Sequence, residues 1–331
     1  MKKWLGAIAL LICMVALGLW KVFQTLDLNK FHHLQPSPGE TTPASDDLRV
    51  SFMGTSSFYI SDGVTNLLVE GFCTRPTLAE LTSPIASDAK KVDKCIDRLD
   101  MRSLDGVFVT HSHYDHSLDA PVFAKRFKAP LFGSESMAAI SRGYGLDEAL
   151  IRTVEGVASF RFGAFEVTFI PSRHSAPLSF LPKNNDQVVR QPLVPPQGVM
   201  EFKMGKVFSL FFRHPKGRFI IHPSDGYAPG IFKGFEADVV FLGIASVGNH
   251  PKSFRDAYYS HIVDEVRPHT VVPIHWDNFM APFDGSLRPF PNTFTSLDVG
   301  LPYLIELNKS YGRRTVVLPL WQTWTPQKNR R

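Results

Sequence analysis

The chain has 331 residues, of which 44% are hydrophobic and 20% charged, a composition typical of a globular protein and not of a disordered or fibrous one. Its formal net charge of +5 comes from the two ends, because five basic residues lie there and the remaining basic residues equal the 31 acidic ones. Since the body is formally neutral, its charge does not indicate a nucleic-acid-binding surface, and no nucleic-acid partner is expected. Three cysteines without a Cys-x-x-Cys pair exclude a disulfide-dense scaffold and a cysteine-built zinc finger.

An uncharged apolar run from Trp4 to Trp20 follows Lys2 and Lys3. Residues 1–23 therefore predict either a cleaved signal peptide or a retained N-terminal membrane anchor, and the length of the run favours the anchor. Both interpretations place the rest of the chain on the periplasmic or extracytoplasmic side of the membrane. We expect an exported protein, tethered to the membrane through residues 4–23 if the segment is not cleaved. Residues 24–47, rich in Pro, Ser, Thr and acidic residues towards their end, predict a linker.

One folded domain is predicted over residues 48–326, followed by a short basic tail at 327–331. Short runs rich in Val, Ile and Phe predict strands, and they are Leu48–Met53, Ser57–Ser61, Asn66–Val69, Gly106–Thr110, Leu131–Phe132, Ala158–Ile170 (a hairpin), Met200–Phe202, Val207–Phe212, Arg218–His222, Val239–Leu242 and Thr270–Ile274. Helices are predicted at Ala89–Leu99, Leu118–Phe127, Ser134–Arg142 and Phe254–Val266. The strands come in two batches, each ending in strand–helix alternation, which indicates an α/β sandwich with two β-rich halves covered by helices.

Two cysteines, Cys73 and Cys95, lie in the predicted domain. An oxidising compartment would allow them to form a disulfide. Two separate small buried residues explain them equally well, so the sequence leaves their pairing open.

The most informative segment is His111-Ser-His-Tyr-Asp-His116, directly after the apolar strand that ends at Thr110. In extended backbone, residues two apart point to the same side, so His111, His113 and Asp115 can converge there. His116 can turn towards them as the next helix begins. Neutral imidazole and carboxylate groups are the ligands that zinc and similar divalent ions prefer. The segment therefore predicts a metal site.

Three isolated residues of the same chemical type follow later strands. His174 comes after the hairpin, Asp225 after Arg218–His222, and His275 after Thr270–Ile274. Loops at strand ends are where catalytic groups are commonly carried. A lone His at such a place is usually an ordinary surface residue, but three together favour further metal ligands.

The seven residues resemble the motif set of the metallo-β-lactamase superfamily, which is His-x-His-x-Asp-His followed by an isolated His, Asp and His. The resemblance covers about residues 48–320 and implies that family's four-layered αββα sandwich. It also implies that His111, His113 and His174 bind one metal ion, that Asp115, His116 and His275 bind a second, and that Asp225 bridges the two. Two divalent ions are then expected as cofactors, first of all Zn²⁺, with Mn²⁺ or Fe²⁺ as alternatives.

The function implied is hydrolysis by a hydroxide bound to the dinuclear metal centre. The hydroxide would attack a phosphodiester, lactone or other ester of a small-molecule substrate, while Asp115 orients the nucleophile as the catalytic residue. A non-catalytic metal-binding module tethered to the membrane is the alternative. Inactive relatives usually lose ligands, and none of the seven is lost here, so the hydrolase is preferred.

Several positions narrow this expectation. Asp225 argues against β-lactam hydrolysis, because the true β-lactamases of the superfamily lack the bridging Asp, and His113 argues against the diiron redox relatives, which carry an acidic residue there. Pro-Ile-His-Trp around His275 is similar to the lactonase-like and phosphodiesterase-like branch. Glu70-Gly-Phe replaces the Asp-Pro or Asp-x-Gly found in many members after the early strand.

Four residues outside the metal motif are candidates for substrate binding. His250 could donate a proton to a leaving group, although a surface position at a helix start is an equally simple reading. The other three follow the last strand and could line the entrance to the site, and they are Trp276, Phe279 and Arg288.

Overall fold

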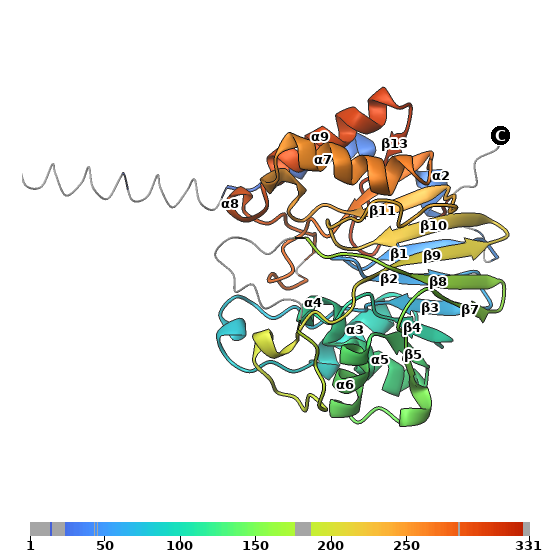
Figure 1. Cartoon of the computed structure of the whole chain (residues 1–331), viewed down its shortest axis with the longest axis vertical. Coiled ribbons are helices and arrows are strands. Elements are labelled where there is room, and N and C mark those ends of the chain that lie inside the picture. The colour runs from blue at the N-terminus through green and yellow to red at the C-terminus, as the bar shows by residue number, and fades with distance from the viewer. Residues whose placement is uncertain are drawn as a thin grey trace, which may run out of the picture.

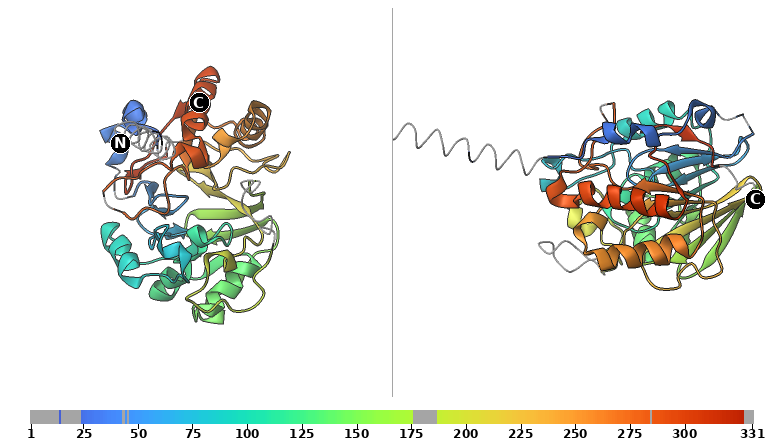
Figure 2. Two further views of the ribbon diagram at one scale, coloured as in Figure 1. Left: turned by 90° about the vertical axis from the view of Figure 1, so that its left-hand side faces the viewer. Right: turned by 90° about the horizontal axis from the view of Figure 1, so that it is seen from above.

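The structure is a computed structural model that describes residues 14, 24–42, 44, 46–175, 187–283 and 285–326. Two seven-stranded sheets lie face to face, and helices cover the outer face of each (Figure 1). The left view of Figure 2 shows the orange and red helices above the strands and the cyan and green helices below them. The four-layered αββα arrangement implied by the resemblance is therefore confirmed.

The first sheet has the strand order β14-β1-β2-β3-β4-β5-β6. Its strands are β1 (Arg49–Phe52), β2 (Phe58–Ser61), β3 (Asn66–Val69), β4 (Gly106–Phe108), β5 (Leu131–Gly133), β6 (Ile151–Thr153) and β14 (Thr323–Trp324). Pairing is antiparallel from β14 to β3 and parallel from β3 to β6. Parallel strands need long crossover connections. These supply the helices α3 (Ala89–Arg98), α5 (Ala120–Phe127) and α6 (Glu135–Gly143).

The second sheet has the order β13-β12-β11-β10-β9-β8-β7. Its strands are β7 (Ala158–Phe162), β8 (Phe165–Pro171), β9 (Phe208–His214), β10 (Gly217–His222), β11 (Val239–Gly243), β12 (Thr270–Ile274) and β13 (Arg314–Thr315). Pairing is antiparallel from β7 to β10 and parallel from β10 to β13. The helices α7 (Lys252–Tyr259) and α9 (Leu297–Ser310) cover this sheet.

Phenylalanine fills much of the space between the two sheets. Phe108 of β4 packs against Phe132 of the same sheet and against Phe169 and Phe212 of the other, with ring centroids 5.3 to 6.2 Å apart. Burying one such side chain contributes about 1.5–3 kcal/mol. The alternating apolar positions of the strands thus join the two halves into one core.

The structure differs from the prediction at one predicted strand and at one helix that was not predicted. The segment Met200–Phe202 is not a strand but includes the 3₁₀ turn η5 (Val199–Glu201). Helix α9 was not predicted, because Gly300 and Pro302 interrupt its sequence pattern. Glycine is needed at position 248, since a Cβ added there would lie 1.9 Å from the Ser296 carbonyl oxygen at the start of α9. A Cβ added at Gly300 would lie 3.0 Å from the backbone nitrogen of Gly248, which is also a close contact. Tertiary packing here outweighs helix propensity.

The predicted linker departs from the prediction in its first part. Residues 24–42 form the 3₁₀ helix η1 (Leu28–Leu34) and the short helix α2 (Pro38–Thr41), and Phe31 packs against the main core. Glu40 is buried and pairs in a bidentate fashion with Arg314, at 2.5 and 2.8 Å. Hydrogen bonds from Arg314 lower the pKa of Glu40 to about 2, although burial opposes the shift. Folded structure therefore begins before Leu48.

The predicted membrane tether is corrected. Within the part of the chain that the structure describes, every helix is too short or too polar to cross a bilayer. Apart from Met14, the apolar run on which the prediction depended lies outside the described residues, as does the basic tail.

Candidate metal centre

The predicted ligands all follow the carboxyl ends of strands. The motif begins three residues after β4, and its second half forms the one-turn helix α4 (Tyr114–Ser117), which has His113 as its N-cap residue. His174 follows β8 and His275 follows β12, while Asp225 follows β10. Since β8, β10 and β12 run in the same direction, their carboxyl ends lie at one edge of the sandwich.

Three histidines form the first of two groups with metal-ligand geometry. In the His111 group (His111, His113 and His174) one ring nitrogen of each residue lies within 4.8 Å of the others. The ring centroids are 4.9 to 5.0 Å apart. Nε2 of His111 is buried and has no hydrogen-bond partner among the described residues. A buried polar atom without a partner is costly, and a cation would satisfy it.

Asp115, His116 and His275 form the second group, the Asp115 group. Oδ2 of Asp115 lies 3.3 Å from Nε2 of His116 and 3.2 Å from Nε2 of His275, and the two ring nitrogens are 3.2 Å apart. All three residues are buried. Three donor atoms converging in this way match the nitrogen and oxygen ligands of a divalent ion.

The two groups are neighbours, because the rings of His111 and His116 are 3.8 Å apart. Asp225 belongs to neither group. It is buried nearby, and its Oδ2 accepts hydrogen bonds from the amide and the hydroxyl of Ser246. Burial lowers the pKa of His174, and the negative charge of Asp225 opposes that shift. The structure therefore brings six of the seven predicted ligands into two adjacent groups, with the seventh close to His174.

The protonation of the two groups differs in the metal-free chain. Burial and the neighbouring His174 lower the pKa of His113 to about 3, and burial also lowers the pKa of His111 well below its usual value. Burial opposes protonation of His116 too, but Asp115 and Glu70 outweigh it and raise its pKa to about 10. Neutral imidazole is the form that binds metal, so the His111 group is ready to bind without losing a proton.

Glu70 contacts the ring nitrogen of His116 that does not face Asp115 or His275. It is fully buried, and its Oε1 lies 3.3 Å from Nδ1 of His116, which also faces the hydroxyl of Ser56 at 3.1 Å. The same oxygen accepts hydrogen bonds from the amide and hydroxyl of Thr110. A carboxylate on the outer nitrogen of a histidine orients the ring towards a metal ion. From the sequence, Glu70 was noted only as a departure from the family pattern.

Asp119 attaches the motif to the loop that follows β3. Its carboxylate is fully buried and accepts hydrogen bonds from the amides of Cys73 and Thr74 and from the hydroxyls of Thr74 and Ser87. The pairing that the sequence left open is present, since Cys73 is joined to Cys95 by a disulfide. The loop that carries Glu70 is therefore held firmly against the metal-binding motif.

The four substrate-binding candidates lie in different environments. Phe279 borders the centre, with its ring 5.4 Å from that of His275 and 6.0 Å from that of Tyr114. His250 stacks on Phe254 at 4.0 Å and faces the Ser246 hydroxyl at 3.3 Å, so it reaches Asp225 through one side chain.

Trp276 is corrected to a core residue, because it is 3% exposed and its indole N–H donates to the Pro273 carbonyl. Its ring therefore has no surface to offer a substrate. Arg288 is exposed, and its backbone carbonyl accepts a hydrogen bond from Asn278.

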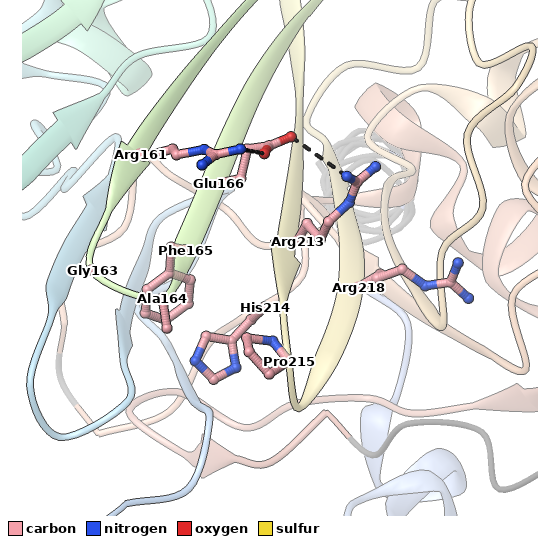
Figure 3. Close-up of a pocket in the computed structure, with 9 residues that line it drawn as sticks. All are labelled: Arg161, Gly163, Ala164, Phe165, Glu166, Arg213, His214, Pro215 and Arg218. Carbon is pink, nitrogen blue, oxygen red and sulfur yellow. Dashed lines mark ion pairs between the residues drawn. The ribbon is translucent and has the colours of Figure 1, made fainter.

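A cavity of about 600 Å³ lies elsewhere, at the turns of the β7–β8 and β9–β10 hairpins (Figure 3). Its arginines are matched by acids, since Glu166 lies 3.5 Å from Arg161 and 3.7 Å from Arg213, and Arg218 pairs with Asp238. None of the predicted ligands lines this cavity. Its size does not make it the active site.

Comparisons with known proteins match this description. Residues 81–276 fit the family described as "Beta-lactamase superfamily domain". A protein of Staphylococcus aureus (strain MRSA252) named a UPF0173 metal-dependent hydrolase is 28% identical over 240 residues, which cover 70% of this chain and 87% of that protein. The corresponding protein of strain JH9 has the same identity and coverage.

Solved structures share the fold at low sequence identity. The metallo-β-lactamase fold protein YhfI from Bacillus subtilis has a TM-score of 0.50 at 16% identity, covering 84% of this chain and 100% of its own. An isothiocyanate hydrolase from Delia radicum gut bacteria has a TM-score of 0.51 at 13% identity, with coverage of 85% and 100%. The match to the CmlA β-hydroxylase has a TM-score of 0.52 at 16% identity. It covers 86% of this chain and 55% of that protein.

Proposed function

Since this chain belongs to the β-lactamase superfamily domain family, we propose that it is a metal-dependent hydrolase with two metal ions, acting on an ester, lactone or phosphodiester of a small molecule. The observation that carries the proposal is the pair of adjacent ligand groups, the His111 group and the Asp115 group. Their residues come from distant parts of the chain and converge at one edge of the sandwich. The names of the Staphylococcus aureus relatives as metal-dependent hydrolases support the same reaction class.

The side chains would divide the work between the two ions. The His111 group would hold one ion, the Asp115 group the other, and Asp225 would lie between them. Zn²⁺ is the first candidate because imidazole and carboxylate suit it, and Mn²⁺ and Fe²⁺ are the alternatives. When bound, such ions lower the pKa of water to about 7 and so supply hydroxide at neutral pH.

Asp115 would be the catalytic residue. Its Oδ2 faces two histidines of its own group, and its charge also acts on His113 of the other group. A carboxylate there would orient the nucleophile and accept its proton. Of the seven proposed ligands only Asp115 and Asp225 are anionic, so two divalent cations and these ligands together would keep a net positive charge. This favours substrates that develop negative charge on oxygen, as esters and phosphodiesters do.

Phe279 and His250 would form parts of the substrate site. Phe279 offers an apolar surface beside His275, while His250 faces the Ser246 hydroxyl, which donates to Asp225. A histidine in this position could protonate a leaving oxygen.

The test combines metal analysis with a substrate screen. Purified protein is loaded with Zn²⁺ or Mn²⁺, its metal content is measured, and it is assayed on p-nitrophenyl acetate, a γ-lactone and bis(p-nitrophenyl) phosphate. We expect two equivalents of metal, turnover of at least one class, and a loss of about 100-fold or more in Asp225→Ala. If wild type and Asp225→Ala bind metal and are equally inert on all three, the non-catalytic metal-binding module replaces the hydrolase.

A further inference from the structure

A second cavity, of about 470 Å³, lies on the outer face of the first sheet and contains none of the metal ligands. It lies between the end of α3 and the strands β14, β1 and β2. Its lining residues are Arg49, Ser51, Tyr59, Ser61, Gly63, Asn66, Arg98, Leu99, Asp100, Arg102, Trp321 and Thr323. Small-molecule sites are commonly cavities of about 300–1,000 Å³.

The floor of this cavity is polar although it is buried. Ser51 and Ser61 are each only 4% exposed, and the Ser51 hydroxyl is hydrogen-bonded to that of Thr323 at 2.7 Å. These side chains alternate along β1, β2 and β14 with the apolar ones that enter the core. A sheet face that only had to be covered by α3 would carry apolar residues here, as it does under Val92 and Ile96.

Two arginines at the cavity have no acidic partner among the residues that the structure describes. Within the described part of the chain, the guanidinium of Arg49 donates only to the Ser61 hydroxyl, at 3.2 Å, and its buried Nε has no hydrogen-bond partner. Arg98 makes no ion pair in the described part of the chain, whereas Arg102 pairs with Asp100. In the hairpin cavity of Figure 3, by contrast, every arginine has an acid within 4 Å. An unmatched guanidinium in a recess is a binding group for an oxyanion.

Aromatic rings complete the wall. Tyr59 and Trp321 both line the cavity, and they are held in place, Tyr59 by a hydrogen bond from its hydroxyl to Asn66 at 2.8 Å and Trp321 by packing on Phe283 at 4.9 Å. Rigid aromatic side chains provide contact area at a low entropic cost.

We propose that this cavity is an accessory site for a small organic anion whose phosphate or carboxylate group binds between Arg49 and Arg98 and whose body packs against Tyr59 and Trp321. The site shares no residue with the metal centre, so its occupation does not depend on the proposed hydrolase activity.

The test is calorimetric titration of the full chain with three probes that separate the two parts of the ligand. Phenyl phosphate and benzoate carry a ring with one or the other oxyanion, and benzyl alcohol carries the ring alone. We expect one of the two anions to bind with one equivalent at this site, at least about tenfold more tightly than benzyl alcohol.

Variants locate the binding. Arg49→Gln together with Arg98→Gln should weaken the preferred anion at least about tenfold. Arg161→Gln, which removes a similar charge from the hairpin cavity, should leave the affinity unchanged. Arg98→Gln alone, at an exposed helix end, should weaken binding about threefold without a change in melting temperature. The proposal is overturned if the wild type binds neither anion, if the double variant binds as the wild type does, or if Arg161→Gln weakens binding as much.

Discussion

The two ligand groups of the metal centre differ in how they are supported. In the Asp115 group, His116 contacts Glu70 and Ser56 through its outer nitrogen, and the amide of His275 donates to the Thr55 carbonyl at 2.7 Å. In the His111 group, the contacts of the outer nitrogens are to neighbours in the chain, since His111 faces Thr110 and His174 faces Ser175.

The two ligand groups also differ in how deeply their side chains are buried. All three members of the Asp115 group are buried, whereas His113 and His174 are partly exposed. The comparison indicates that one group is preorganised by the fold and the other is open to exchange with solvent. Preorganised ligands lose less entropy on binding a metal ion, so we expect the Asp115 group to retain its ion longer than the His111 group.

The largest effect is expected from Asp115→Asn. The amide keeps the shape of the side chain but loses the charge that His116 and His275 face. Activity should fall by about 1,000-fold or more, and bound metal should fall from two equivalents to one. Metal analysis and kcat/KM on the best substrate from the screen give the result. Retention of both ions with full activity would remove Asp115 from the proposed roles.

Glu70→Gln tests whether the Glu70 carboxylate supports His116 as a metal ligand. Loss of the carboxylate that contacts His116 should weaken metal binding by about 10- to 100-fold at the Asp115 group. The effect should be smaller at the His111 group, which Glu70 reaches only through the Thr110 hydroxyl. Competition with a chelator measures the two affinities separately. Glu166→Gln, in the hairpin cavity, is the matched control and should change neither. Equal weakening at both groups would show that Glu70 acts on the fold as a whole.

The stability of the metal-free protein depends on pH in part through His222. Burial lowers its pKa to about 4, although the Gly226 carbonyl and Asp225 oppose the shift. Below pH 6.5 the unfolded chain binds a proton that the folded chain refuses, so this contribution to stability is complete above pH 6.5 and is lost as the pH falls towards 4. Between pH 7.5 and 5 the loss should be about 2 kcal/mol.

Urea unfolding of chelator-treated protein at these two pH values measures the difference. In His222→Gln, which cannot titrate but can still form hydrogen bonds, the pH dependence should be smaller by that amount. An unchanged pH dependence would contradict the assignment of a buried neutral imidazole.

Ser246→Ala should have the smallest effect. It removes one of two hydrogen bonds to Asp225 and the contact to His250, while the backbone amide of Ser246 continues to donate. We expect kcat to fall about tenfold with little change in KM or metal content. A large loss of metal instead would place Ser246 among the groups that support the ligands.

Strands and metal motif were predictable because both depend on local pattern. Apolar runs of four to six residues mark most strands, and His111, His113 and Asp115 follow one of them at a spacing of two. Helix α9 was missed because Gly300 interrupts its helical pattern and packs closely against the backbone of Gly248, 52 positions away, which no local pattern records. Likewise the edge strands β13 and β14 have two residues each and depend on the strands that they pair with.

For the site, residue chemistry alone identified which side chains could bind metal, since imidazole and carboxylate groups after strands are recognisable wherever they occur. Their division into two groups was implied only by the family resemblance, while the closeness of the groups, the support of His116 by Glu70 and the burial of Trp276 came from folding. These are contacts between residues 40 or more positions apart, or exposures that depend on what packs above a side chain. The sequence determines which chemical groups are present, and packing between distant residues determines the distances on which their chemistry depends.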